Sequence, residues 1–236
     1  MTSYPKFRRN SVSTLILIAG LAIARPVFAA SPNSASQYRQ QGLAYRQQER
    51  FPEAIAAFEK AAELAPKDVS ARILLGWTQH LAGQESEAAR SLWSAIYLDP
   101  FSVQAFNALG IVYLVQGELP PAITSHTWAA LLKPDNEIAY YNLSLAYHRQ
   151  KLHTVAIANA KRAAQLEPGN PHPLVAEAIA HWDNGDRNAA IQSFRSAVSI
   201  DSRYGDANFL DYLKEAGFST EQIQTSKQVL LQGAGE

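Results

Sequence analysis

Histidine and cysteine are the side chains most able to bind metal ions or to act as nucleophiles. This 236-residue sequence has neither residue in a pattern typical of such sites. It contains no cysteine, which excludes a disulfide framework, a thiolate zinc site, an iron–sulfur cluster, a cysteine nucleophile and a lipid-anchored cysteine. No two histidines have the spacing of the HExxH zinc motif. The histidines are His80, His126, His148, His153, His172 and His181.

Other catalytic motifs are missing as well. The sequence has neither a glycine-rich phosphate loop nor a GxSxG nucleophile elbow. His148 and His153 are five residues apart, which makes a poor chelate on a helix. The formal net charge is zero, so composition does not indicate nucleic-acid binding. We therefore expect no catalytic residue, no metal and no cofactor, and we expect a binding protein rather than an enzyme.

A 34-residue period organises the chain, and it is marked by prolines that follow small residues at fixed distances. The prolines are Pro66, Pro100, Pro134 and Pro168. The small residues precede them by 24 positions (Gly42, Gly76, Gly110, Ser144), by 12 (Ala54, Ala88, Ala122, Ala156) and by five (Ala61, Ala95, Ala129, Ala163). A fifth unit keeps the period with Ala178, Ala190, Phe194 and Ala197 and has Ser202 in place of the proline.

Each unit contains two helical patterns of 12–14 residues with turn residues between them, such as Gly83 and Gly117. A small residue in the first helix, such as Gly76, allows the second helix to approach closely. The proline ends the second helix and begins the next unit. The sequence therefore predicts helix pairs that stack in series.

The markers resemble the tetratricopeptide repeat, whose pattern has an aromatic residue at position 4, Leu-Gly at 7–8, and Ala, Ala and Pro at 20, 27 and 32. The resemblance implies an all-α fold, an α-solenoid of five helix–turn–helix repeats in a right-handed superhelix, with C-terminal capping helices. The implied repeats are 35–68, 69–102, 103–136, 137–170 and 171–204. Local departures are Arg72, Gln79, His126, Ala160 and Glu177.

The resemblance also implies where a partner binds, because the first helices of such repeats line a concave inner face. Positions 5, 9 and 12 form one helical stripe on that face. The stripe predicts an apolar, aromatic groove with a basic end, occupied by a protein or peptide. The candidate partner-binding residues are Arg39, Leu43, Arg46, Ile73, Trp77, His80, Asn107, Ile111, Tyr141, Leu145, His148 and Trp182.

Several alternatives compete with an open groove. The stripe could pack between helices without any partner, or residues 205–236 could occupy it. His80 and His148 are expected to be solvated at its rim, or to gain charge beside an acidic partner. Trp93 and Trp128, on second helices, are expected in core or convex packing.

A clamp for a C-terminal carboxylate is disfavoured by the inner-face residues. Only Arg39 matches the basic and asparagine positions that such clamps use. The positions that fail are Leu43, Leu74, Gln104 and Ala108.

The segment Met1–Ala29 resembles a secretory signal peptide. A basic start around Lys6 precedes an apolar run from Val12 to Ala24, and Val27 and Ala29 suit the −3 and −1 positions of a cleavage site. A retained membrane anchor is the alternative, although 13 residues are fewer than the roughly 20 that span a bilayer. This segment holds four of the 21 basic residues and none of the 21 acidic ones, so the mature chain carries a net charge of −4.

Residues 205–236 lose the repeat markers. Ser219 and Gln222 form the pattern of a capping box, which predicts a final helix to about Gln232. This tail could cap the solenoid, fill its groove or bind a partner.

Together these features predict an exported scaffold that aids assembly or recruitment of an envelope complex, in the periplasm or, in a photosynthetic host, the thylakoid lumen. The alternative is a permanent subunit of a membrane-associated assembly, such as a pilus, secretion or photosynthetic complex. We expect a monomer or weak oligomer that inserts into no membrane after cleavage and binds no nucleic acid. Residues 30–34 form a short lead into the first repeat.

Overall fold

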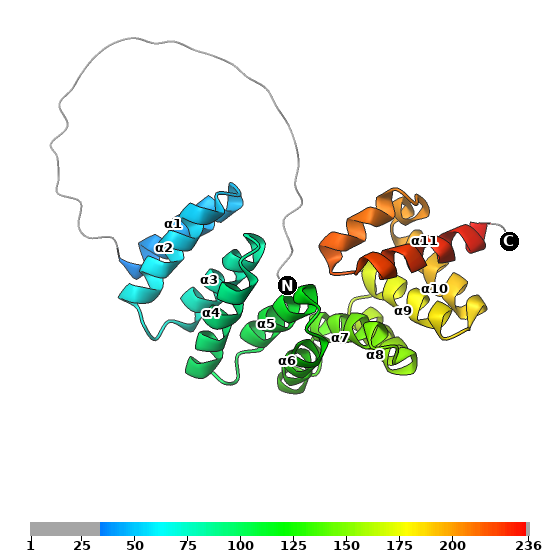
Figure 1. Ribbon diagram of the computed structural model, residues 1–236, viewed down its shortest axis with the longest axis horizontal. Helices are drawn as coiled ribbons and strands as arrows, with labels where there is room; N and C mark the ends of the chain where they lie inside the picture. Colours follow the sequence, from blue (N-terminus) through cyan, green and yellow to red (C-terminus); the bar gives the residue numbers. More distant parts are fainter. Residues whose placement is uncertain (1–33, 235–236) are drawn as a thin grey trace, which may run out of the picture. The chain divides into compact units, whose positions relative to one another are not determined.

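The computed structural model describes residues 34–234, so the predicted signal peptide and residues 30–33 lie outside the described residues. Five helix pairs follow one another along the array in Figure 1. They are α1 (Ala35–Gln47) with α2 (Phe51–Leu64), α3 (Val69–Leu81) with α4 (Glu85–Leu98), α5 (Val103–Gln116) with α6 (Leu119–Leu132), α7 (Glu137–Arg149) with α8 (His153–Leu166), and α9 (Pro171–Asp183) with α10 (Arg187–Ile200). The predicted all-α fold of stacked helix pairs is confirmed.

Polar caps start the first helix of every pair at the same point of the period. In each case the side chain accepts a hydrogen bond from a backbone N–H of the first turn, which otherwise has no partner. The cap residues are Ser34, Asp68, Ser102, Asn136 and Asn170. The turn within each pair also repeats, since Gly83, Gly117 and Gly185 adopt φ angles of 74–88° that favour glycine.

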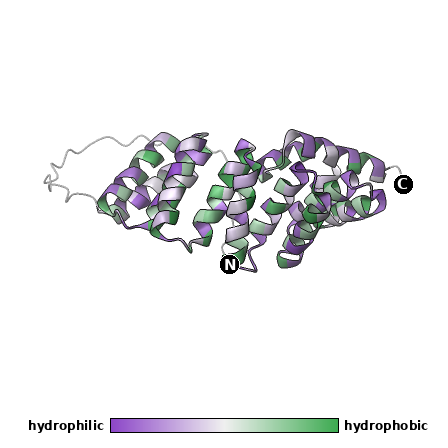
Figure 2. Cartoon of the chain, turned by 60° about the horizontal axis from the view of Figure 1, so that its bottom comes forward, coloured by the Kyte–Doolittle hydropathy of each residue, from purple (hydrophilic) through white to green (hydrophobic). Residues whose placement is uncertain are grey.

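The glycine in each of the first helices α1, α3 and α5 lies directly against a side chain of the second helix of its pair. A Cβ added to Gly42 would come within 2.7 Å of the Phe58 ring, and one added to Gly76 would come within 2.7 Å of Leu92 Cγ. These distances leave no room for a side chain, so glycine sets the separation of the two helices. Figure 2 shows apolar and polar residues interleaved along the helices, and the buried apolar residues form four clusters along the array.

His126 occupies position 24 of the third repeat, where the first and fifth repeats have Phe58 and Phe194. It is fully buried against Gly110, and neither ring nitrogen has a hydrogen-bond partner among the described residues. Burial lowers its pKa to about 3.

The chain beyond the repeats consists of η1 (Ser202–Gly205), η2 (Phe209–Ala216) and α11 (Thr220–Ala234). Residues 205–234, here called the C-terminal segment, pack on α9 and α10, as a cap would. The predicted capping box is present, because Gln222 N–H donates to Ser219 Oγ and Ser219 N–H donates to Gln222 Oε1. Residues 209–216 form a 3₁₀ helix. Within residues 34–234, no helix is long and apolar enough to cross a membrane.

Replacing Gly76 with leucine should destabilise the fold by about 1–3 kcal/mol, because the added side chain would collide with Leu92. Gly169→Leu is the matched control, since a Cβ at Gly169 meets no atom within 4 Å. The free energy of unfolding from urea titration measures both. Equal stability of the two variants would contradict this packing.

His126→Phe should protect the fold against acid. The pKa of buried His126 is about 3. Below about pH 6.5 His126 therefore binds a proton in the unfolded chain but stays neutral in the folded chain. The stability advantage of the variant over the wild type should therefore grow by about 2 kcal/mol between pH 7 and pH 5. Urea titrations at the two pH values test this, and an unchanged difference would mean that His126 is not buried in its neutral form.

Candidate functional site

The predicted inner-face stripe divides into two parts. The first, here called the open half, consists of Arg39, Leu43, Arg46, Ile73, Trp77, His80, Asn107 and Ile111, and it is exposed or half-buried. The second, here called the covered half, consists of Leu114, Tyr141, Leu145, His148, Val175, Ile179 and Trp182, and it lies against the C-terminal segment.

Three polar residues of the open half already have partners within the chain. Arg39 donates to the Asp68 carboxylate at 2.6 Å. His80 Nδ1 lies 2.7 Å from Glu85 Oε2, so the expectation that His80 is a freely solvated rim histidine is wrong. The Arg39–Asp68 pair joins α1 to the start of the next helix pair, and the His80–Glu85 contact joins α3 to α4 of the same repeat. Arg39 and His80 therefore have structural roles.

Asn107 is also engaged, because its amide exchanges two hydrogen bonds of 3.1 and 3.2 Å with that of Asn136. Arg46 differs from these residues. Among the described residues no carboxylate pairs with it, and burial lowers the pKa of its guanidinium. Arg46 is therefore the cation of the open half that is available to an anionic or carbonyl group of a partner.

The apolar part of the open half is built from first helices. Leu43 is 38% exposed, while Ile73, Trp77 and Ile111 are half-buried. Trp77 packs on the core and on the His80 ring, whose centroid is 5.1 Å away. Trp77 is thus held in place while part of its surface stays accessible.

The covered half contradicts the prediction of an open groove along the whole array. Leu145 has no exposed surface, and His148 is only 8% exposed. The C-terminal segment covers them with apolar side chains that belong to the same core cluster, including Leu213 and Phe218. Of the alternatives for residues 205–236, the described residues therefore show both capping and filling of the groove.

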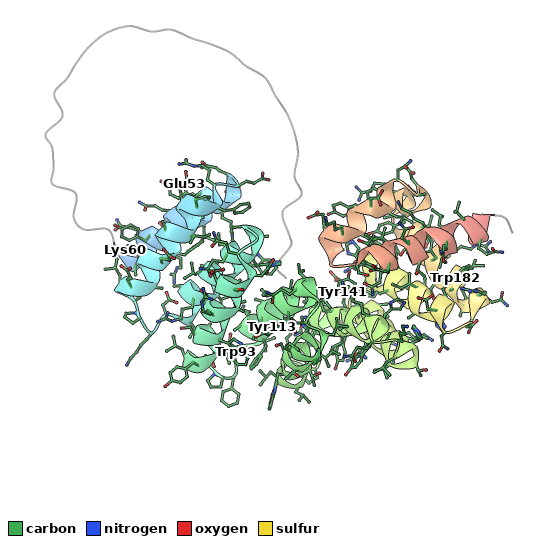
Figure 3. The ribbon with its side chains drawn as sticks, in the orientation of Figure 1. Glu53, Lys60, Trp93, Tyr113, Tyr141 and Trp182 are labelled. Carbon is green, nitrogen blue, oxygen red and sulfur yellow. The ribbon has the colours of Figure 1, made fainter. Side chains whose placement is uncertain are left out.

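Two aromatic residues of the covered half have specific partners. The Tyr141 hydroxyl donates to the Ala216 carbonyl at 2.5 Å, and burial raises the pKa of this hydroxyl well above its ordinary value. Figure 3 shows Tyr141 on the side of the array that faces the C-terminal segment. Trp182 lies under the Arg187 guanidinium, whose central carbon is 3.6 Å from the ring centroid.

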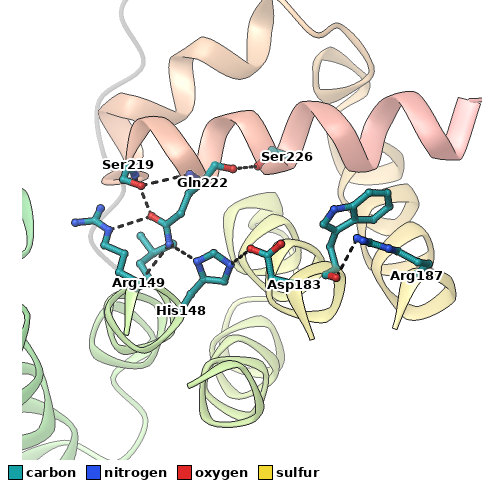
Figure 4. Close-up of polar contacts among 9 residues, drawn as sticks. His148, Arg149, Asp183, Arg187, Ser219, Gln222 and Ser226 are labelled. Carbon is teal, nitrogen blue, oxygen red and sulfur yellow. Dashed lines mark hydrogen bonds and ion pairs between the residues drawn. The ribbon is translucent and has the colours of Figure 1, made fainter. Parts of the chain in front are cut away.

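A polar network, missed by sequence reasoning, joins the covered half to the C-terminal segment (Figure 4). Arg149 donates to the carbonyls of Leu114 and Gly217 and to Gln222 Oε1. Gln222 also contacts His148, which contacts Asp183. The expectation that His148 is a solvated rim residue is therefore wrong, because the network buries it. The capping-box motif identified Gln222 but gave no sign of this second role.

Trp93 and Trp128 lie on the second helices α4 and α6 and are each 51% exposed. They line a hollow with Phe106 and Tyr113, and Trp93 Nε1–H donates to the Tyr113 hydroxyl at 2.9 Å. Figure 3 shows Trp93 and Tyr113 near each other. The sequence predicts core or convex packing for these tryptophans, and about half of each residue is exposed, so they are not core residues. Within residues 34–234, no group of three potential metal ligands comes together.

Known proteins share this architecture. Two sequence models described as tetratricopeptide repeat match residues 39–103, 107–171 and 174–204. A crystal structure of MamA is similar with a TM-score of 0.64 and 27% identity, covering 72% of this chain and 92% of MamA. No curated protein matches in sequence.

Two further solved structures share the fold at lower identity. TTC0263, a thermophilic repeat protein of Thermus thermophilus, is 20% identical with a TM-score of 0.60, covering 78% of this chain and 98% of its own. YrrB, described as having an unusual peptide-binding site, is 16% identical with a TM-score of 0.60, covering 77% and 92%. Because the repeat models match well over half of the sequence, this chain belongs to the tetratricopeptide repeat family.

Proposed function

We propose that this chain is an exported, non-enzymatic scaffold whose open half binds a peptide or helix of a partner protein and so aids assembly or recruitment of an envelope complex. One observation carries the proposal. The covered half of the same stripe is already occupied by a peptide segment, supplied by the chain itself. The open half offers the same kind of surface without an occupant among the described residues.

The C-terminal segment indicates what chemistry the inner face accepts. It presents large apolar side chains such as Leu213 and Phe218, and its backbone carbonyls accept from Tyr141 and Arg149. The open half offers apolar Leu43, Trp77 and Ile111 beside the cation of Arg46. A matching partner is a short helix or peptide with two or three large apolar side chains and a carboxylate or free carbonyl for Arg46. Buried aromatic and arginine contacts of this type dominate interface energetics.

Proteins of this family generally act as interaction scaffolds, which supports a binding function. YrrB, a protein of the same fold, is described as having a peptide-binding site. That likeness, at 16% identity, supports the class of function and not the choice of partner.

A permanent structural subunit is the second candidate, and exposed aromatic residues on α4 and in the turn that follows it favour it. Tyr97 is 88% exposed and Phe101 is 75% exposed, close in sequence to Trp93. Exposed aromatic clusters of this kind typically mark contact surfaces. Sedimentation of the isolated mature chain separates the candidates, because a scaffold should stay monomeric or weakly associated and a permanent subunit should aggregate.

Trp77→Ala and Leu43→Ala should each weaken binding of the partner recovered from envelope extract. The expected loss is about 1–4 kcal/mol for Trp77, typical of a central interface aromatic, and less for Leu43. Titration calorimetry with the purified partner measures the dissociation constants. Leu64→Ala is the matched control, because Leu64 is 49% exposed on the second helix α2. Unchanged affinity of the Trp77 variant would exclude the open half as the binding surface.

Stability of the same variants distinguishes surface from core. Leu43 and Leu145 share repeat position 9, but they are 38% and 0% exposed. Leu145→Ala should therefore cost about 2–5 kcal/mol of folding free energy, and Leu43→Ala far less. Urea titration measures both, and an equal loss would show that Leu43 is a core residue.

Export predicts a mature N-terminus at Ala30, after the Val27-x-Ala29 site. Sequencing of the protein purified from its host measures this directly. Recovery of the intact segment Met1–Ala29 in a membrane fraction would favour an anchored protein instead.

A further inference from the structure

The network that holds the C-terminal segment has donors and acceptors that can be assigned without ambiguity. The guanidinium of Arg149 and the backbone N–H of Ser219 can only donate, and both face the same side-chain oxygen of Gln222, at 3.1 and 2.9 Å. That atom must therefore be the amide oxygen. The amide nitrogen of Gln222 is then the atom directed at the Leu145 carbonyl and at His148 Nδ1, each at 3.2 Å.

This assignment fixes the protonation of His148. The Gln222 amide nitrogen can only donate, so His148 Nδ1 must accept with its lone pair. The ring proton consequently lies on Nε2, which donates to Asp183 Oδ2 at 3.0 Å. Only one neutral tautomer of His148 satisfies every partner in the chain of bonds shown in Figure 4.

Protonation of His148 disrupts the chain of bonds. A second ring proton on Nδ1 would face the N–H groups of the Gln222 amide, placing donor against donor. Rotating the Gln222 amide would not relieve this conflict, because its nitrogen would then face the donors of Arg149 and Ser219. Three hydrogen bonds join α7 to Gln222 of α11, and the one to His148 requires a neutral histidine.

We propose that the C-terminal segment is a releasable occupant of the inner face, and that protonation of His148 loosens it and uncovers Tyr141 and Leu145. This inference does not depend on the identity of any partner. Residues 205–234 would then compete with any other ligand for the covered half, and a fall in pH would weaken their binding.

The charged and titratable groups around His148 set the direction of the effect. Burial lowers the pKa of His148, and the ring of His153, whose centroid is 5.4 Å away, lowers it further, while Asp183 opposes both. Arg149 lies next to it in sequence, and Glu221 on α11 interacts with Arg149. In the released form His148 would regain its ordinary pKa of about 6.5.

The sign of the pH dependence follows. The segment is held fully above about pH 6.5, where both forms carry a neutral His148. Below that pH His148 binds a proton more readily in the released form than in the docked form. The equilibrium constant for release of the segment therefore rises as the pH falls, by up to tenfold per pH unit. Burial lowers the pKa of His172 as well, but the rings beside it, Tyr141 and Tyr204, both lie outside the C-terminal segment, so the effect is assigned to His148.

Thiol labelling can measure this opening, because the chain has no cysteine of its own. Ser226→Cys places a reporter on α11 at a position with no exposed surface. Gln224→Cys, at an exposed position of the same helix, is the matched control. Dividing the labelling rate of Ser226→Cys by that of Gln224→Cys removes the pH dependence of the thiol itself. Thr78→Cys, fully buried in α3, reports global unfolding.

Labelling with 4,4′-dithiodipyridine should show the reactivity of Ser226→Cys, relative to Gln224→Cys, rising up to about fivefold between pH 6.5 and pH 5.5. Thr78→Cys should stay protected over this range. A ratio independent of pH, or equal exposure of Thr78→Cys, would overturn the proposal.

Two variants assign the effect to His148. His148→Asn keeps an acceptor near Gln222 but cannot titrate, so the rise should be lost. Gln222→Glu should suppress or reverse the rise, because a carboxylate accepts from Arg149, from Ser219 N–H and from protonated His148. Wild-type pH dependence in both backgrounds would exclude His148 as the controlling group.

Discussion

The close approach of two helices at a small residue is the contact on which the rest of this structure depends. Gly42 rests on Phe58, Gly76 on Leu92 and Gly110 on His126, each with no space for a Cβ. Because the contact recurs in the first three repeats, and Ser144 and Ala178 keep a small residue at the same position of the last two, the first helices align along one face. The inner-face stripe exists only because this spacing is kept.

The C-terminal segment divides that face into two environments. Leu43 and Leu145 occupy the same repeat position and have the same side chain, yet one is 38% exposed and the other fully buried. Apolar burial and the hydrogen bonds of Arg149 hold the segment over the fourth and fifth repeats and Leu114 of the third, whereas the first two repeats and Ile111 of the third keep their stripe residues accessible. One sequence pattern therefore serves as core at one end of the array and as candidate binding surface at the other.

The 34-residue period predicted the fold because small residues, turn residues and prolines are local signals. The same signals recur in each repeat, so each repeat forms the same helix pair and the pairs stack. The candidate site was predicted only in part. Arg39 and His80 are held by Asp68 and Glu85, and those partners lie in the next turn or pair. Leu145 and His148 are buried by a segment without repeat markers, whose docking site cannot be derived from periodicity. Arg149 bears no signal in the sequence, because its function depends on carbonyls 35 and 68 residues away.

The central claim is that a partner binds the open half while the second helices stay free, and oxidative footprinting of the tryptophans tests it most directly. The four tryptophans sample three environments, and cleavage after Ala29 would remove the only methionine. Trp77 lies in the open half, Trp182 under Arg187, and Trp93 and Trp128 on the second helices. Partner binding should protect Trp77 and leave Trp93 and Trp128 as reactive as before. Protection of Trp93 and Trp128 with Trp77 unchanged would contradict the account and place the partner on the second helices.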